Sequence, residues 1–261
     1  MDISLKNKKA LVGGSSRGIG KAVAQQLAES GASVTLMARS EEKLRALVSQ
    51  LPTDQGQRHQ YLVVDFTDLN AYKKIIGAYF EHNTVDLLIN NTQGPSAGSA
   101  LDKGMDDYQA AFDLLFKTVV YTTELALKGM VAQKYGRIIN IASVSVKEPL
   151  PYLALSNTIR SAVVTWSKSL ASEVGRYNIT VNSTLTGYFN TERIKELNGA
   201  KAKNLGIPMD EIDKQMILNV PVGRYGDPKE YGYLVAFLAS GRASFITGTN
   251  IPIDGGLLRS L

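Results

Sequence analysis

The sequence predicts a doubly wound α/β fold, in which a parallel sheet of about seven strands is covered by helices on both faces. Short β-rich runs alternate with longer amphipathic segments along all 261 residues, and this order builds a parallel sheet from strand–helix–strand units. Several strand-like runs are also continuous stretches of Val, Ile and Leu. Such runs are typical of strands that are buried on both faces.

Each element is predicted from its own pattern of apolar and polar residues. The predicted strands span Lys9–Val12, Ser33–Met37, Tyr61–Val64, Leu87–Asn90, Arg137–Ile141, Thr180–Thr184 and Gly248–Ile253. The predicted helices span Ile19–Ser30, Glu41–Gln50, Leu69–His82, Asp106–Gln133, Pro151–Tyr177 and Pro228–Ser240. Residues 190–220 carry mixed helical signals, and we expect them to form a substrate lid. Because no Pro- or Gly-rich linker divides the chain, residues 1–261 are expected to form a single Rossmann-like domain.

Composition restricts the classes of function. The net charge is +5 at pH 7 and the basic residues are dispersed, which argues against nucleic acid as a partner and favours a mildly basic cleft for an anionic ligand. The chain has no cysteine, so disulfides, thiolate catalysis and cysteine-ligated metals are excluded. His59 and His82 lack the spacing of metal ligands, and we expect no metal site.

The sequence also gives no sign of a membrane segment. No apolar run approaches the ~18–20 residues that span a bilayer. The first nine residues are too polar and too few for a signal peptide. We therefore expect a cytoplasmic protein with no membrane partner.

A glycine-rich loop follows the first predicted strand. Its glycines, Gly14, Gly18 and Gly20, let the backbone turn tightly and approach a pyrophosphate without a Cβ in the way. The helix that begins at Ile19 then directs its N–H groups and positive dipole end at the phosphates. The loop residues predicted to bind the cofactor are Gly14, Ser16, Arg17, Gly18, Ile19 and Gly20.

The end of the second predicted strand indicates which dinucleotide is bound. An acidic residue there usually binds the 2′-hydroxyl of NAD, but this chain has Arg39. An arginine suits the 2′-phosphate of NADP, and Arg17 adds a second cation on the same side. The sequence therefore favours NADP over NAD. After the third strand, the Asp65 carboxylate is placed to accept a hydrogen bond from adenine, with Phe66 beside it; Asn91 follows the fourth strand.

Taken together, these motifs resemble the short-chain dehydrogenase/reductase family from about residue 5 to the C-terminus. The matching segments are Gly13-Gly14-Ser15-Ser16-Arg17-Gly18-Ile19-Gly20, Asn90-Asn91-Thr92-Gln93, Ile141-Ala142-Ser143, Thr186-Gly187 and Ile253-Asp254-Gly255-Gly256. The chain looks most like the 3-oxoacyl-carrier-protein reductase-like members. The resemblance implies an NADP-dependent oxidoreductase that interconverts carbonyls and alcohols, with 3-oxoacyl thioesters or acyl-carrier-bound substrates as candidates. It also implies that Thr191 holds the nicotinamide amide.

Most of the catalytic residues of the short-chain dehydrogenase/reductase family are replaced in this chain. The family uses a serine, a tyrosine that donates the proton, a lysine that lowers the tyrosine pKa, and an asparagine that holds a relay water. Ser143 matches the serine, but Ser156 and Arg160 stand at the tyrosine and lysine positions, and Leu115 stands at the asparagine position. An aliphatic hydroxyl is far less acidic than a phenol, so Ser156 is a poor proton donor. Arg160 retains the ability to hold ribose hydroxyls.

Two interpretations of this site remain open. In the first, another group donates the proton: Tyr152 is the leading candidate because it lies one turn before Ser156, and Tyr188 and Tyr121 are the others. In the second, the chain binds the cofactor with little or no catalysis, as a sensor or an inactive partner subunit. Assembly is predicted separately, because the two long helices carry more apolar residues than one face needs. We expect a homo-dimer or homo-tetramer.

Overall fold

The computed structural model describes residues 3–260. Within this range, seven strands form one sheet in the order β3-β2-β1-β4-β5-β6-β7, and every neighbouring pair is parallel. The strands are β1 Lys9–Gly13, β2 Ser33–Ala38, β3 Gln60–Val63, β4 Leu87–Asn90, β5 Gly136–Ile141, β6 Ile179–Thr186 and β7 Asn250–Ile253. The predicted doubly wound α/β fold is confirmed.

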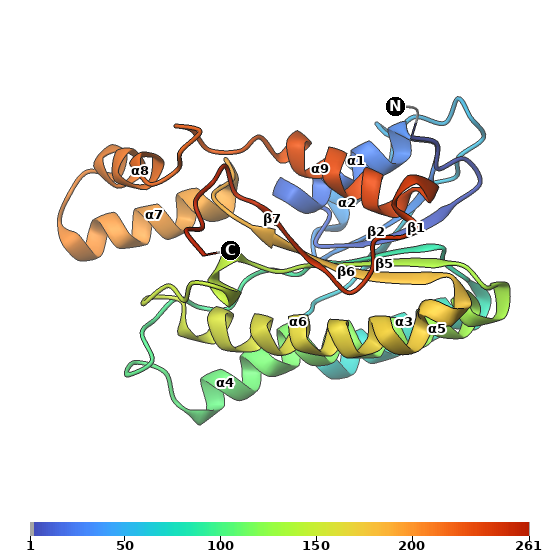
Figure 1. Cartoon of the computed structure of the whole chain (residues 1–261), viewed down its shortest axis with the longest axis horizontal. Coiled ribbons are helices and arrows are strands. Elements are labelled where there is room, and N and C mark those ends of the chain that lie inside the picture. The colour runs from blue at the N-terminus through green and yellow to red at the C-terminus, as the bar shows by residue number, and fades with distance from the viewer. Residues whose placement is uncertain (1–2, 261) are drawn as a thin grey trace.

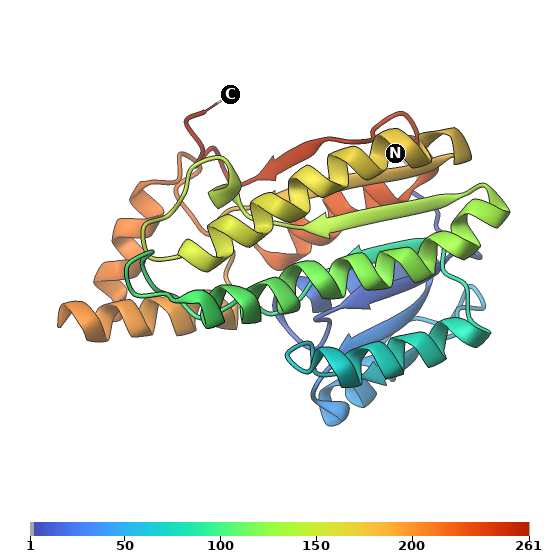
Figure 2. The same ribbon diagram turned by 90° about the horizontal axis from the view of Figure 1, so that it is seen from below.

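Helices cover both faces of the sheet (Figure 1, Figure 2). Helices α1, α2 and α9 lie on one face and α3 to α6 on the other, while α7 and α8 extend beyond one end of the sheet. Their bounds are α1 Gly18–Glu29, α2 Glu41–Val48, α3 Leu69–His82, α4 Met105–Phe112, α5 Thr118–Gln133, α6 Ala154–Val174, α7 Glu192–Leu205, α8 Met209–Leu218 and α9 Pro228–Ala239. Each face has its own core of buried aliphatic and aromatic side chains.

The long helix predicted over residues 106–133 is interrupted. A π-helical turn, Asp113–Lys117, separates α4 from α5, so the helix accommodates one extra residue. Across this turn Phe112 and Phe116 stack with ring centroids 4.8 Å apart, and the edge of Trp166 from α6 meets Phe116. Helix α6 also begins at Ala154 instead of Pro151, because the turn before it pairs with another loop: the N–H of Gly98 donates to the Tyr152 carbonyl.

The strand order places a crevice between β1 and β4. Strands β2 and β3 lie on one side of β1, and the chain then crosses to the other side of β1 to form β4. The loops that follow β1 and β4 therefore lead to helices on opposite faces of the sheet. Ligands of doubly wound sheets bind at this switch point, outside the carboxyl ends of the strands. The two loops also pack tightly here, since a Cβ on Gly13 would overlap the Asn91 carbonyl.

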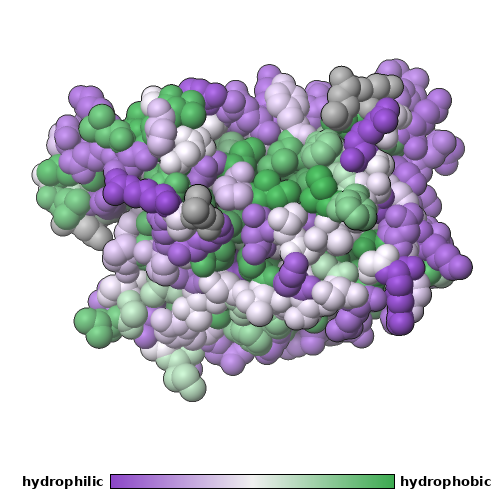
Figure 3. All heavy atoms as spheres, viewed as in Figure 1, coloured by the Kyte–Doolittle hydropathy of each residue, from purple (hydrophilic) through white to green (hydrophobic). Residues whose placement is uncertain are grey.

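Apolar side chains gather at the centre of the face shown in Figure 3, over α9 and β7. Tyr233 on α9 and Phe245 shortly before β7 are exposed large side chains. Strand β7 is the last strand of the sheet and pairs only with β6 among the described strands. This edge is therefore a second apolar surface, separate from the long helices.

Candidate active site

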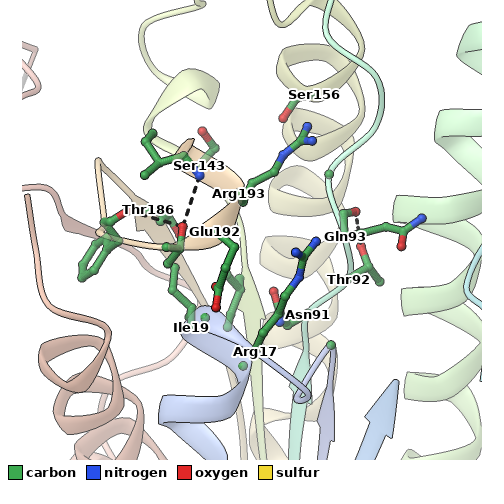
Figure 4. Close-up of a pocket in the computed structure, with 18 of the residues that line it drawn as sticks. Arg17, Ile19, Asn91, Thr92, Gln93, Ser143, Ser156, Thr186, Glu192 and Arg193 are labelled. Atoms are coloured by element: carbon green, nitrogen blue, oxygen red, sulfur yellow. Dashed lines mark hydrogen bonds between the residues drawn. The ribbon is translucent and has the colours of Figure 1, made fainter. Parts of the chain in front are cut away.

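A cavity of about 710 Å³ opens at the carboxyl ends of the strands, where the loops after β1, β2, β4, β5 and β6 converge with the start of α7 (Figure 4). The predicted site residues that line it are Gly14, Ser16, Arg17, Gly18, Ile19, Gly20, Arg39, Phe66, Asn91, Ser143, Tyr152, Ser156, Arg160 and Thr191. The fold thus joins the predicted phosphate-binding and catalytic residues in a single hollow.

The glycine loop has the backbone shape that a pyrophosphate needs. Gly14 and Gly18 adopt left-handed conformations, with φ of +56° and +54°, which side chains other than glycine adopt at a cost. The buried Ser15 hydroxyl fixes the loop to β2 by accepting a hydrogen bond of 2.9 Å from the Met37 N–H. Arg17 precedes α1 without capping it, so the first N–H groups of the helix face the cavity unshielded by its side chain. These residues fit a dinucleotide.

Three cationic side chains line the same half of the cavity. Arg39, at the end of β2, is exposed, and Lys43 in the first turn of α2 lies near it along the chain. Arg17 has a partner that its sequence position does not reveal: its Nη1 lies 2.8 Å from Oε1 of Glu196 on α7. Arg39 is therefore the cation placed most simply for a 2′-phosphate.

Asp65 differs from the expectation for it. It does not line the cavity, although its neighbour Phe66 does. Its Oδ1 accepts hydrogen bonds from the hydroxyl and the N–H of Thr67, at 2.7 and 2.9 Å, and these bonds lower the pKa of the carboxyl. The carboxylate that was predicted to bind adenine is thus hydrogen-bonded within a local turn.

The matched serine stands where the fifth strand ends. Ser143 caps the short 3₁₀ turn Val144–Val146, and its Oγ accepts a hydrogen bond of 3.1 Å from the Ser145 N–H. That contact uses an acceptor position of the hydroxyl and leaves its proton available for a ligand oxygen. Ser143 lines the cavity, where its hydroxyl can donate to a ligand.

Ser156 and Arg160 face the cavity from consecutive turns of α6, as their spacing predicts. The Arg160 Nε donates to Ser156 Oγ at 3.3 Å, and its Nη1 donates to the Ile141 carbonyl at 2.6 Å. Burial lowers the pKa of Arg160 to about 10, so the guanidinium is charged at neutral pH. Ser156 is buried and already accepts a bond from a cation, which makes the pair a binding element with no strong acid.

Leu115 completes the departure from the family pattern. It is buried in the π-helical turn and lines a hollow of about 10 Å³ together with Asn90, Asn140 and Arg160. A single water needs roughly 10–15 Å³. The hollow is at the lower limit for one water molecule, and Leu115 offers that water no hydrogen bond.

Two of the candidate tyrosines meet in the cavity. Tyr152, before α6, and Tyr188, after β6, both line it, and their phenol groups interact with each other. Burial raises the pKa of both phenols; the interaction with Tyr188 opposes this for Tyr152, whereas the Tyr188 pKa reaches about 12. Tyr152 is thus the better acid of the pair. Tyr121 is elsewhere, with its hydroxyl donating to the Lys73 carbonyl.

The segment predicted as a lid forms α7 and α8. Thr191 caps α7, its Oγ1 accepting from the Ile194 N–H at 3.4 Å. A Cβ on Gly18 would lie 3.4 Å from the Thr191 methyl carbon, so the base of this segment rests on the glycine loop. Thr191 therefore lies between the glycine loop and the segment predicted as the lid.

Three charged residues of α7 line the cavity and were not predicted from the sequence: Glu192, Arg193 and Glu196. Arg193 extends into the cavity in Figure 4, and its Nη2 donates to the Pro95 carbonyl at 2.8 Å. Glu196 lies one turn later and pairs with Arg17. The only available signal was the i, i+3 spacing of opposite charges directly after Thr191, which is common on solvated helices.

The described residues also bear on metals and membranes. Between residues 3 and 260, no group of three or more His, Asp or Glu side chains is arranged to hold a metal ion. No helix in that range has both the length and the apolar character to cross a bilayer.

The seven-stranded parallel sheet, with the glycine loop at its switch point and the serine at the end of β5, is a Rossmann-type fold. The chain belongs to the short-chain dehydrogenase/reductase family. The family model described as enoyl-(acyl carrier protein) reductase matches residues 14–258. The resemblance inferred from the sequence is confirmed.

Similar proteins include enzymes and solved structures that match the whole chain. A 3-oxoacyl-(acyl-carrier-protein) reductase FabG of Haemophilus influenzae is 34% identical over 260 residues, covering 98% of this chain and 100% of the relative. L-sorbose reductase from Gluconobacter frateurii, solved with NADPH and L-sorbose, superimposes with a TM-score of 0.91 at 28% identity and full coverage of both chains. YwfH, an NADPH-dependent reductase involved in bacilysin biosynthesis, gives a TM-score of 0.91 at 28% identity, with 97% and 99% coverage.

Proposed function

We propose that this protein is an NADP-dependent reductase that interconverts a carbonyl and an alcohol, with Tyr152 as the proton donor. The observation that carries the proposal is the single cavity that joins the glycine loop and Arg39 to Ser143 and Tyr152. Similar proteins whose structures contain NADPH support the choice of cofactor.

The cofactor is proposed to lie along the switch-point crevice. The glycine loop and the start of α1 would hold its pyrophosphate, and Arg39 its 2′-phosphate, through charge-assisted hydrogen bonds. Thr191, between this loop and the catalytic half, is placed to contact the nicotinamide end. When bound, the reduced nicotinamide supplies a hydride for the carbonyl carbon.

The protein residues would stabilise the negative charge that develops on the carbonyl oxygen and would supply its proton. Ser143, whose hydroxyl proton is available, donates a hydrogen bond to this oxygen. Tyr152 transfers its phenolic proton to the same oxygen, and the Tyr188 hydroxyl then stabilises the resulting phenolate. The positive charge of Arg160 favours this negative charge within the cavity.

The substrate class is suggested by relatives. Curated relatives at 27–34% identity are 3-oxoacyl-(acyl-carrier-protein) reductases. A 3-oxoacyl thioester is therefore the first substrate to test. Simple ketones and keto sugars follow, because L-sorbose reductase shares the fold.

The deciding experiment is a screen of NADPH oxidation over 3-oxoacyl thioesters, ketones and keto sugars, with Tyr152→Phe and Tyr121→Phe variants. Tyr121 serves as the matched control because its hydroxyl bonds outside the cavity. Turnover that Tyr152→Phe lowers by about 10²-fold or more, and Tyr121→Phe leaves unchanged, is the expected result. Turnover that survives in Tyr152→Phe would exclude Tyr152 as the acid.

One observation favours a second candidate function, cofactor binding without turnover. Ser156 and Arg160 bond to each other and to the Ile141 carbonyl, so the residues at the usual acid positions are engaged within the protein. A protein of this kind would act as a sensor or as an inactive partner subunit. It would bind NADPH tightly and oxidise it with none of the screened carbonyls, which separates the two candidates.

A further inference from the structure

Arg160 is a charged side chain without a charged partner. Its Nε and Nη1 groups donate to neutral oxygens, those of Ser156 and Ile141, and its Nη2 makes no hydrogen bond within residues 3–260. No carboxylate in that range lies within ion-pair distance of Arg160, although the residue lines the cavity. Arg160 is partly exposed at the cavity wall, and a partly desolvated cation without an anion is stabilised when a ligand supplies one.

A second guanidinium lines the same cavity. In Figure 4 Arg193 extends from α7 toward Ser156, which lies one turn from Arg160. The charge of Arg193 adds to the effect of burial in lowering the pKa of Arg160, so the two like charges act on each other across the cavity. An anion bound in the cavity would offset this repulsion.

Arg193 has one ion-pair partner among the described residues, Glu196, and it shares this partner with Arg17. Glu196 lies 3.9 Å from the Arg193 Nη1, and its other oxygen is 2.8 Å from Arg17. The closer contact is with Arg17, in the phosphate-binding half. The catalytic half therefore keeps two guanidinium groups and no closely bonded carboxylate within the described chain.

Resting on the reductase function proposed above, we infer that the substrate carries a carboxylate close to the carbonyl that is reduced, and that Arg160 and Arg193 bind it. An arginine pair suits a planar carboxylate because each guanidinium presents parallel N–H donors. The cofactor phosphates are assigned to the glycine loop and Arg39, at the other end of the cavity. Ser143, the carbonyl donor, shares the β5 terminus with Ile141, so the carboxylate site adjoins the reacting group.

The test compares matched ligands that differ only in charge. Acetoacetate is paired with methyl acetoacetate, and levulinate with methyl levulinate, because each pair keeps the ketone and removes the negative charge. Binding is measured by calorimetry with the free protein and with the protein saturated in NADP⁺. We expect the acid of at least one pair to bind about 10-fold or more tightly than its ester.

Variants assign the effect to the two arginines. Arg160→Gln and Arg193→Gln should each remove most of the preference for the acid, whereas Arg160→Lys should keep part of it. Lys195→Gln is the control, since Lys195 lies on α7 beside Arg193, is exposed and does not line the cavity. Arg193 is partly exposed on the surface of α7, so Arg193→Gln tests the inference even if Arg160→Gln does not fold.

The outcomes separate this inference from the function on which it rests. Equal binding of acids and esters, or a preference that persists in both glutamine variants, overturns the inference. A loss of NADPH affinity in Arg160→Gln as large as the loss of acid binding assigns Arg160 to the cofactor, and this also overturns it. Failure of the protein to bind NADPH would refute the proposed function, while titration of the free protein would still decide whether the acid site exists.

Discussion

Arg17 of the glycine loop and Glu196 of α7 form an ion pair of 2.8 Å that links the phosphate-binding loop to the predicted lid. The two residues are separated by 179 positions in the sequence, and both side chains are about half exposed. The pair holds one of the cations that a phosphate would use, so ligand binding and the position of α7 are coupled.

This coupling predicts that Glu196→Gln tightens NADPH binding. Releasing Arg17 from its carboxylate removes a competitor, and an exposed ion pair of about 0.5–1 kcal/mol corresponds to roughly a two- to five-fold gain in affinity. Fluorescence titration measures it. Glu211→Gln on α8, exposed and outside the cavity, is the control; a weaker affinity in Glu196→Gln would contradict the competition.

Arg39 is expected to set the preference for NADPH over NADH. A charge-assisted contact of about 1.5–3 kcal/mol with the 2′-phosphate implies a preference of roughly 10- to 100-fold. Arg39→Ala should lose most of it, whereas Arg45→Ala, exposed on α2 and paired with Glu41, should retain it. Equal titration curves for the two cofactors with the unmodified protein would refute the assignment.

The acid of the related enzymes can be restored by substitution. Introduced into Tyr152→Phe, the substitutions Ser156→Tyr, Arg160→Lys and Leu115→Asn should raise carbonyl reduction about 10²- to 10⁴-fold over Tyr152→Phe alone, the usual worth of general acid catalysis. The same variant without Leu115→Asn should gain less, because the hollow beside Leu115 barely holds a water. Steady-state NADPH oxidation measures both, and no gain in a folded variant that carries all three substitutions and binds NADPH would show that Ser143 is not positioned for the reaction.

The pH dependence follows from the direction of the tyrosine shifts. Burial raises the pKa of Tyr152, so its phenol keeps its proton through neutral pH and is available for reduction. The rate of reduction should be level from about pH 6 to about pH 9 and fall only as the pH rises above the ordinary tyrosine pKa of about 10. The rate of alcohol oxidation, which needs the Tyr152 phenolate, should instead increase as the pH rises toward the tyrosine pKa. A fall in reduction centred near neutrality would point to a different acid.

Assembly is expected to depend on the face of α5 and α6. On these two helices Val119 and Val163 are buried, whereas several other apolar side chains remain partly accessible: Val120, Leu125, Leu127, Val164, Trp166 and Leu170. Val120→Glu should dissociate or aggregate a dimer or tetramer, whereas Lys128→Glu, exposed on the same helix, should not. Light scattering decides this, and a monomeric unmodified protein at micromolar concentration would refute the expectation.

The strands were predicted within two residues at each end because buried parallel strands are continuous apolar runs between turn signals. The exact bounds of α3, Leu69–His82, were also predicted, because the alternation of apolar and polar residues typical of a helix stops at polar residues on both sides of this segment. The π-helical turn was missed, because one extra residue barely alters the apolar period of a long helix. The prediction that Asp65 binds adenine did not include its competing bonds to Thr67, which depend on local geometry.

The site was predicted more completely for backbone features than for charge pairs. Glycine spacing reports the shape of the loop directly, and the glycine, serine and threonine positions all line the cavity. The contacts of Arg193 with Pro95 and of Glu196 with Arg17 join residues 98 and 179 positions apart. No local pattern encodes such pairs, so the cations of the catalytic half emerged only once the chain was folded.

The π-helical turn sets the rotational phase between α4 and α5. Each residue of an α-helix advances about 100° around the axis, and the wide turn absorbs one extra residue, so forcing Asp113–Lys117 into α-helical geometry at unchanged length would swing α4 by that angle. The stacked rings of Phe112 and Phe116 would then separate, and Tyr108 and Ala111 would leave the core that they share with α6. Deleting one residue within Asp113–Lys117 should therefore be tolerated better than deleting one within α4 or α5, because it removes only the residue that the turn absorbs.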